Sequence, residues 1–203
     1  MKKFLLLIAS VLLIQVQGSA APCTTGTLAS YIALGSAGCI LGNLQVADFA
    51  YRAKASGGAA EITAEQIMVM PLLPPVGTFG LQFGAPWDVQ SGQDQFSGIT
   101  YHVAASSTAT PVQELRLDGN GFKAGLFGSV VVNEVVATAA ATHDLQVYEK
   151  CEEICSSKTS ATLDLKPAAS TLVVADAVAL KSELGPASLT SFVDWFVICI
   201  PCV

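Results

Sequence analysis

The sequence has little of what catalysis and nucleic-acid binding require. Only 13% of its 203 residues are charged, two are histidines, and 10 basic residues stand against 16 acidic ones. Nucleic-acid binding depends on basic side chains that neutralise phosphates, so a chain of net charge -6 is predicted to bind no nucleic acid. The sequence also lacks a catalytic motif, a metal-ligand cluster and a cofactor fingerprint. We therefore predict no catalytic residue, no metal and no cofactor.

Neither histidine belongs to a recognisable catalytic arrangement. His102 lies within an alternating segment, opposite its apolar face, which is typical of a solvated side chain. His143 precedes Asp144, but neighbours on an extended chain point to opposite faces and form no dyad. A hydrolase would need His102, or two carboxylates, in a cleft. The carboxylates that we consider for such a pair are Asp88, Asp94, Glu114 and Glu134.

The N-terminus reads as a secretory signal peptide. Lys2 and Lys3 precede an apolar run from Phe4 to Val16, and residues 18–20 are small. The run is shorter than the roughly 20 residues that span a bilayer, so membrane contact is expected only through the leader before its cleavage after Ala20. Residues 21–203 then form a single secreted domain, extracellular or periplasmic. Without the two lysines, 8 basic and 16 acidic residues give it a net charge of -8.

Six cysteines follow the predicted cleavage site, and an even number in an exported chain predicts disulfides. They fall into three local pairs, and we favour Cys23 with Cys39, Cys151 with Cys155, and Cys199 with Cys202. The first pair closes a loop of about 15 residues, worth roughly 3 kcal/mol in the chain-entropy model. Zinc bound by the last four cysteines, and lipid attached to Cys23, are less favoured alternatives.

Short runs punctuated by glycine, proline, serine and asparagine predict an all-β fold, an antiparallel β-sandwich that resembles a jelly roll. Alternation is clearest at Ile99, Tyr101 and Val103, and a slip of the apolar phase predicts a bulge near Asp48. The other predicted strands cover residues 28–34, 44–51, 67–72, 79–83, 112–117, 129–136, 144–148, 162–165, 171–180 and 189–200.

Two features modify this pattern. Asp118-Gly119-Asn120-Gly121 is typical of a hairpin turn, which we prefer to a calcium loop because Phe122 and Lys123 occupy positions where such a loop needs an oxygen ligand and a glycine. Residues 63–70, where Thr63 and Gln66 could form a capping box, and residues 137–157 permit a helix.

The last predicted strand is apolar on both faces. Leu189, Val193, Trp195 and Val197 lie on one face, and Phe192, Phe196, Ile198 and Ile200 on the other. Such a strand must be covered on both sides, by the core and by a loop, a partner or a membrane. A possible ligand or partner surface is therefore assigned to Trp87, Tyr101, Phe192, Trp195 and Phe196.

The N-terminal block carries a resemblance to a known family. The segment Pro22-Cys23-Thr24-Thr25-Gly26-Thr27-Leu28-Ala29-Ser30-Tyr31-Ile32-Ala33-Leu34-Gly35, then Gly38-Cys39, Gly42-Asn43-Leu44, Phe49 and Tyr51, resembles the mature start of bacterial PEP-CTERM sorting-domain proteins. The resemblance implies an exported β-sandwich protein of the envelope or extracellular matrix, with no enzymatic activity to carry over. Residues 193–203 lack the Pro-Glu-Pro, hydrophobic helix and terminal arginines of that family.

Three functions are consistent with these observations. The leading one is a secreted, non-catalytic structural, adhesive or matrix-associated bacterial protein, whose partners would be extracellular polysaccharide or further copies of itself. The second is a carbohydrate-binding module, which requires Trp87 and a nearby tyrosine on an exposed face. The third is a secreted hydrolase.

Overall fold

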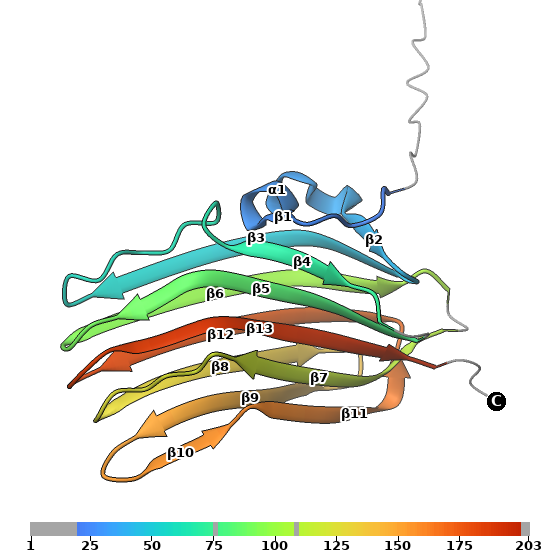
Figure 1. Ribbon diagram of the computed structural model, residues 1–203. Helices are drawn as coiled ribbons and strands as arrows, with labels where there is room; N and C mark the ends of the chain where they lie inside the picture. The colour runs from blue at the N-terminus through green and yellow to red at the C-terminus, as the bar shows by residue number, and fades with distance from the viewer. Residues whose placement is uncertain (1–19, 75–76, 108–109, 200–203) are drawn as a thin grey trace, which may run out of the picture.

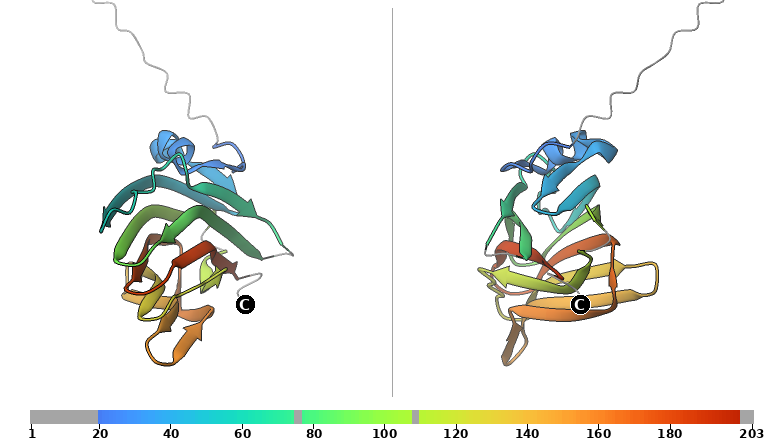
Figure 2. Two further views of the ribbon diagram at one scale, coloured as in Figure 1. Left: turned by 60° about the vertical axis from the view of Figure 1, so that its left-hand side comes forward. Right: turned by 90° about the vertical axis from the view of Figure 1, so that its right-hand side faces the viewer.

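The computed structural model describes residues 20–74, 77–107 and 110–199. Two antiparallel sheets lie face to face, with almost no helix (Figure 1), which confirms the predicted all-β sandwich. The predicted signal peptide and Cys202 fall outside the described residues, apart from Ala20. Figure 2 shows how both sheets twist across the sandwich.

The six-stranded sheet holds β13 near its centre. In spatial order it consists of β1 (Gly26–Thr27), β4 (Met68–Leu72), β5 (Thr78–Val89), β13 (Ala187–Ile198), β7 (Val112–Asn120) and β11 (Ser160–Ala169).

The seven-stranded sheet holds β12 at its centre. Its spatial order is β10 (Cys155–Lys158), β9 (Thr142–Cys151), β8 (Gly128–Ala137), β12 (Thr171–Ser182), β6 (Gln93–Ala105), β3 (Leu44–Ser56) and β2 (Cys39–Leu41). The bulge predicted near Asp48 is confirmed, because the pairing of β3 with β6 shifts between Ala47 and Ala50, and Asp48 has a φ of 55°.

The core fills the space between the sheets, because alternate residues of each long strand point inward. In β8 and β12 these inward rows are mostly valine and leucine. The buried apolar members are Val130, Val132 and Val136 from β8, and Leu172, Val174, Val178 and Leu180 from β12.

The strand predicted over residues 28–34 is wrong, because Leu28–Ala33 form helix α1, followed by the 3-10 helix η1 (Gly35–Ala37). The Thr27 hydroxyl accepts a hydrogen bond from the Ser30 backbone N–H (3.2 Å) and caps the helix. Leu28 and Tyr31, three residues apart, are both buried on one helical face. The helical spacing of these two residues was the signal that the strand interpretation overlooked.

The hairpin predicted at residues 118–121 is also wrong. Strand β7 continues to Asn120, pairing with β13, and the next strand, β8, lies in the other sheet. A side chain on Gly119 would collide with the Phe122 ring, at 2.0 Å. The glycine therefore permits a close approach where the chain crosses between sheets, rather than a tight turn.

Neither permitted helix forms. Residues 64–66 make only a turn, in which the Gln66 side chain accepts a hydrogen bond from the Thr63 N–H (2.8 Å), and β4 follows. Residues 137–157 form the end of β8, strand β9 and the start of β10. The Thr138 hydroxyl accepts hydrogen bonds from the N–H groups of Ala140 and Ala141 and so turns the chain.

Candidate functional site

Three acidic side chains meet between the sheets, where the strand pattern calls for apolar ones. Glu134 of β8, Asp176 of β12 and Asp194 of β13 each occupy an inward position, and their exposed fractions are 1%, 2% and 0%. One carboxylate oxygen from each lies within 4.8 Å of the other two. We call these three residues the carboxyl cluster.

Strand pairing brings the acids together. Glu134 lies directly opposite Asp176 in the seven-stranded sheet, a cross-strand pair of like charges that opposes folding when both are ionised. Asp194 reaches them from the facing sheet, where its strand neighbours are the buried residues Leu81 and Leu117. The Tyr101 hydroxyl of β6 donates a hydrogen bond to Asp194 Oδ2 (2.6 Å). Four strands from both sheets therefore contribute to this site.

Most oxygens of the carboxyl cluster lack a hydrogen-bond donor. Both oxygens of Glu134, both of Asp176 and Oδ1 of Asp194 are buried without a donor from the described residues. A buried, unsatisfied polar group costs about 1–3 kcal/mol, and an unpaired charge costs more. The cluster therefore requires protons or a cation to be stable in the core.

Burial raises the pKa of each acid, because the charged form loses its hydration. For Asp194, burial raises the pKa to about 7, against the lowering effect of the hydrogen bond from Tyr101. Burial and the charge of Asp194 raise the pKa of Glu134 well above its ordinary value. Burial and the charges of Asp194 and Glu134 do the same for Asp176.

Sequence reasoning missed two members of this cluster. Glu134 was among the four carboxylates considered, but Asp176 and Asp194 were not. The alternation of the strands could have identified both residues. Asp176 lies between Val174 and Val178 in a row of residues that point inward, and Asp194 lies between Phe192 and Phe196 in another.

A second polar group in the core surrounds Ser97 of β6. The Trp87 indole N–H donates to the Ser97 hydroxyl (3.0 Å), and the Tyr51 hydroxyl lies 3.0 Å from the same oxygen. The Tyr51 hydroxyl also donates to the Ile62 carbonyl (2.7 Å). We call Tyr51, Trp87 and Ser97 the serine network. Each of its polar side-chain atoms has a partner.

The predicted aromatic surface does not form. Trp87, Tyr101, Phe192 and Phe196 are buried in the core, and Trp87 and Tyr101 find internal partners for their polar atoms. Phe192 stacks on Phe83, with ring centroids 5.0 Å apart. These side chains offer no platform for a sugar, so the assignment of Trp87 to a carbohydrate-binding face is wrong.

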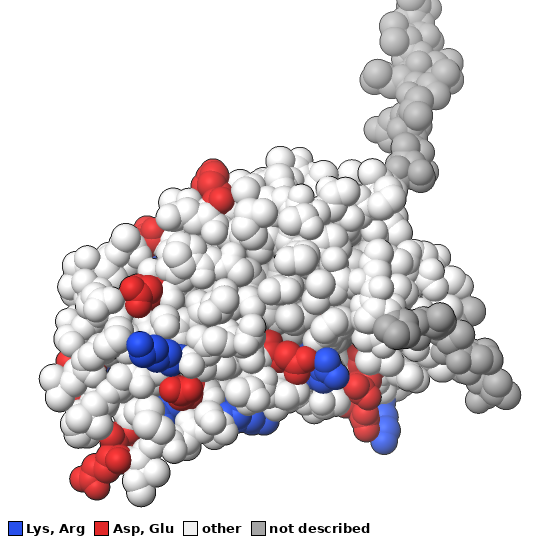
Figure 3. Space-filling model, viewed as in Figure 1, with Lys and Arg blue, Asp and Glu red and all other residues white. Residues whose placement is uncertain are grey.

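Trp195 is the partly exposed member of the predicted surface, on the outer face of β13. Its indole N–H donates to Asp118 (2.8 Å), and the Arg116 guanidinium lies over its ring, 5.3 Å from the centroid. Arg116 and Asp118 also form an ion pair (2.8 Å). Figure 3 shows this side of the molecule, where basic and acidic residues lie close together. The Trp195 ring is therefore bound by Arg116 and Asp118 of its own sheet.

The two predicted faces of the last strand need one correction. Leu189 points inward like Phe192 and Phe196, although it was placed with Val193, because the pairing of β13 with β5 shifts between Leu189 and Ser191. Val193 lies half-buried on the outer face.

The histidines lie on the surface side of the seven-stranded sheet. His102 Nδ1 is 3.2 Å from Asp48 Oδ2, and their side chains are 55% and 43% exposed. The pair lies in an open hollow of about 530 Å³ whose lining includes Ser36. His143 and Asp144 alternate along β9, as predicted. Of the other carboxylates considered, Asp88 and Asp94 are exposed and Glu114 is half-buried.

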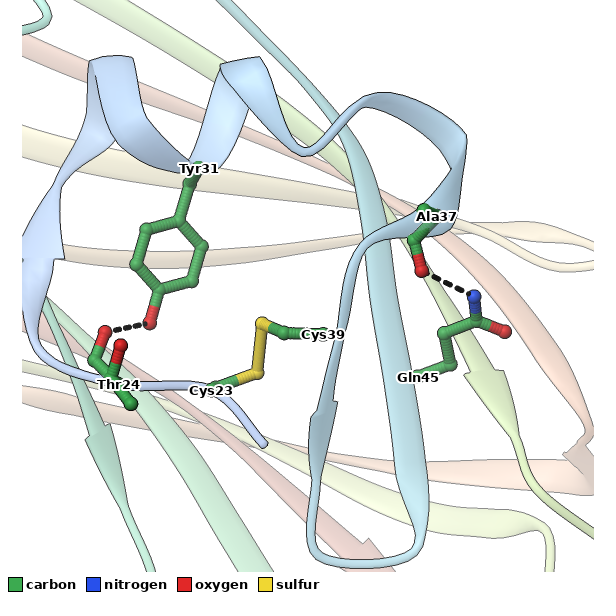
Figure 4. The surroundings of a disulfide bond; sticks show 6 residues. All are labelled: Cys23, Thr24, Tyr31, Ala37, Cys39 and Gln45. Atoms are coloured by element: carbon green, nitrogen blue, oxygen red, sulfur yellow. Dashed lines mark hydrogen bonds between the residues drawn. A yellow bond between two sulfur atoms is a disulfide. The ribbon is translucent and has the colours of Figure 1, made fainter. Parts of the chain in front are cut away.

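Two predicted disulfides are confirmed. Cys23 bonds to Cys39, with the α-carbons 4.9 Å apart, and joins the chain before α1 to β2 (Figure 4). Cys151 bonds to Cys155 between β9 and β10, which removes these thiols from any zinc site. Cys199 is also disulfide-bonded, and its predicted partner lies outside the described residues. Disulfides of this kind are typical of an oxidising, extracellular-type environment.

Near the N-terminal disulfide, two side chains donate hydrogen bonds to backbone carbonyls. Figure 4 shows the Tyr31 hydroxyl donating to the Thr24 carbonyl (2.8 Å) and the Gln45 amide donating to the Ala37 carbonyl (2.9 Å).

Among the described residues, no helix is long and apolar enough to cross a membrane.

Comparison with known proteins adds little. The chain matches no protein-family model and no curated protein. Among solved structures it is similar to the enzymatically active domain of tailspike protein 4 from bacteriophage CBA120, at 8% identity and a TM-score of 0.29. That match covers 78% of this chain and 19% of the tailspike chain.

Proposed function

We propose that this chain is an exported, non-catalytic structural protein of a bacterial cell surface or extracellular matrix. The observation that carries the proposal is the pair of disulfides, Cys23–Cys39 and Cys151–Cys155, in a β-sandwich. Both have the pairing expected for a leader-bearing chain that folds outside the cytosol. The resemblance to PEP-CTERM sorting-domain proteins supports the same location.

The polar chemistry of the core supports a structural role. The carboxyl cluster is sealed from solvent, so no substrate reaches it in the folded state. The aromatic residues Trp87, Tyr101, Phe192 and Phe196, which a sugar-binding surface would need to expose, are buried in the core. The domain is acidic and is held together by disulfides. The partners that we propose for its surface are extracellular polysaccharide and further copies of the protein itself.

Export is tested by expressing the full chain in a bacterium and separating cytosol, periplasm and medium. We expect the protein outside the cytosol, with a mass that begins at Ala21 and with cysteines that resist alkylation until a reductant is added. The matched control lacks residues 2–20 and should remain in the cytosol with alkylatable thiols. Full-length protein with its leader intact, recovered from the cytosol, would contradict the proposal.

One observation favours hydrolysis as a second candidate function. His102 and Asp48 form the orienting half of a nucleophile–base arrangement, and Asp48 lies at a bulge in a left-handed conformation. Among the described residues, however, the contact found for the His102 side chain is the one with Asp48 and not one with a hydroxyl, so the nucleophile is missing from the arrangement. Turnover of a nitrophenyl ester that is lost in His102→Ala and retained in His143→Ala would establish this function in place of the first.

A further inference from the structure

The carboxyl cluster has the composition of a metal site. Calcium is bound in proteins by six to eight oxygens at 2.3–2.6 Å, mostly from carboxylates and carbonyls. Glu134, Asp176 and Asp194 supply six carboxylate oxygens, and one from each residue lies within 4.8 Å of the others. Two oxygens that share one calcium ion can be at most about 5 Å apart, so this spacing is compatible with a common ion.

The unpartnered oxygens point independently to a ligand. Five of the six carboxylate oxygens are buried with no donor from the described residues, and the sixth accepts from Tyr101. Apolar side chains flank the cluster along its strands: Val132, Val136, Val174, Val178, Phe192 and Phe196. In the part of the chain that the structure describes, no lysine, arginine or histidine is buried. The positive charge that would stabilise the ionised acids therefore has to come from outside the described chain.

From this geometry we infer that Glu134, Asp176 and Asp194 form an internal binding site for one calcium ion that ties the two sheets together. The ion would join β8 and β12 of one sheet to β13 of the other, where like charges otherwise face each other. Calcium fits better than magnesium, which requires near-ideal octahedral geometry and retains several waters. A site with 0–2% exposure is poorly suited to a hydrated ion.

The charge of the carboxyl cluster favours a multivalent cation. Three ionised carboxylates carry a charge of -3, of which a divalent ion balances two. The trivalent ion Tb³⁺ balances all three charges and should bind more tightly than Ca²⁺.

Because the site is sealed, the ion must be removed and restored through unfolding. The purified protein is unfolded in guanidinium with EDTA, its disulfides intact, and refolded with or without CaCl₂. We expect one Ca²⁺ per chain to remain after gel filtration. Extracellular modules bind Ca²⁺ with dissociation constants of about 10⁻⁴ to 10⁻³ M, so 10 mM CaCl₂ should raise the Tm by roughly 3–10 °C.

Tb³⁺ luminescence locates the ion. Tyr101 contacts Asp194 directly, so excitation of tyrosine should sensitise Tb³⁺ that is bound at the cluster during refolding. Ca²⁺ added to the same refolding mixture should suppress the signal by competition. The matched variants are Glu134→Gln, which removes one charge at constant size inside the cluster, and Glu153→Gln, which does so at an exposed acid. Asp176→Asn provides a second internal variant.

The expected result is that Glu134→Gln and Asp176→Asn lose the Tm rise and the sensitised signal, while Glu153→Gln keeps both. An unchanged Tm of the wild-type protein in CaCl₂, or binding that survives both internal variants, would overturn the inference. An equal Tm rise with MgCl₂ would overturn the choice of calcium. None of these outcomes depends on whether the protein is exported, so the inference is tested separately from the proposed function.

Discussion

The core of the sandwich contains two groups of polar side chains, and they differ in whether the protein itself supplies their hydrogen-bond partners. The serine network consists of neutral side chains, and Ser97 lies between the Trp87 N–H and the Tyr51 hydroxyl. The carboxyl cluster consists of acids, and five of its oxygens have no donor within the described chain. The serine network is complete within the protein, whereas the carboxyl cluster needs protons or an ion from solution.

The two polar groups should therefore differ in how their contributions to stability depend on pH. A neutral, fully bonded group contributes about equally at every pH. A buried acid contributes according to how many protons the folded and unfolded states bind. The carboxyl cluster therefore makes the stability of this sandwich dependent on the composition of the medium.

The largest expected effect is the pH dependence of stability in EDTA. Asp194 has an ordinary pKa of 3.8, which the fold raises to about 7. A raised acid pKa means that the folded state holds its proton longer, so this contribution is intact below about pH 4 and is lost as pH rises to about 7. About 3 pKa units correspond to roughly 4 kcal/mol. Glu134 and Asp176 extend the loss to higher pH.

Urea unfolding at pH 4, 6 and 8 measures this effect. The internal control is Asp194→Asn, because it removes the group whose pKa the fold raises to about 7 and should therefore remove most of the loss of stability between pH 4 and pH 7. A wild-type profile as flat as that of Asp194→Asn would show that Asp194 does not hold its proton in the fold.

A smaller loss is expected from the serine network. Ser97→Ala leaves the Trp87 N–H without its acceptor and deprives Tyr51 of one of its two partners, which should cost about 1–3 kcal/mol. The cost should be the same at pH 4 and pH 8, because the network contains no group that titrates in this range. Urea unfolding of Ser97→Ala at both pH values measures it.

The control is Ser56→Ala, at an exposed serine that bonds Asp94, and its effect should stay within about 0.5 kcal/mol. A cost for Ser97→Ala that grows with pH would mean that the two groups do not act separately.

The sequence allowed the layers to be predicted more reliably than the site. Long alternating segments such as residues 129–136 and 171–180 specify strands, because period-2 burial leaves few alternatives. The short segment 28–34 is ambiguous, and a cap at Thr27 with two buried residues one turn apart made it helical. The cross-over after Asn120 depends on which sheet accepts β8, which no local turn signal encodes.

The carboxyl cluster was harder to predict because it joins residues that are 18 to 60 positions apart along the chain. Asp176 and Asp194 each replace an apolar residue in an inward row, so the phase of the strand marks them as buried. Their meeting with Glu134 requires both the strand order of one sheet and the facing of the other. For the same reason, a charged residue in an inward row is a better guide to a site than a pair of acids close together in sequence.

The smallest effect, and the sharpest comparison, comes from Tyr101→Phe. This variant removes the hydroxyl that donates to Asp194 Oδ2 while it keeps the ring in the core, and its cost at pH 4 should be about 1 kcal/mol. The lost hydrogen bond had lowered the Asp194 pKa, so the variant raises that pKa further. Because the pKa of about 7 lies about one unit below pH 8, this rise increases the cost at pH 8 by at most about 1.4 kcal/mol relative to pH 4. Urea unfolding in EDTA at the two pH values measures the difference. A cost that is equal at both would show that Asp194 holds its proton throughout, and that the tyrosine belongs with the neutral, self-sufficient polar groups of the core.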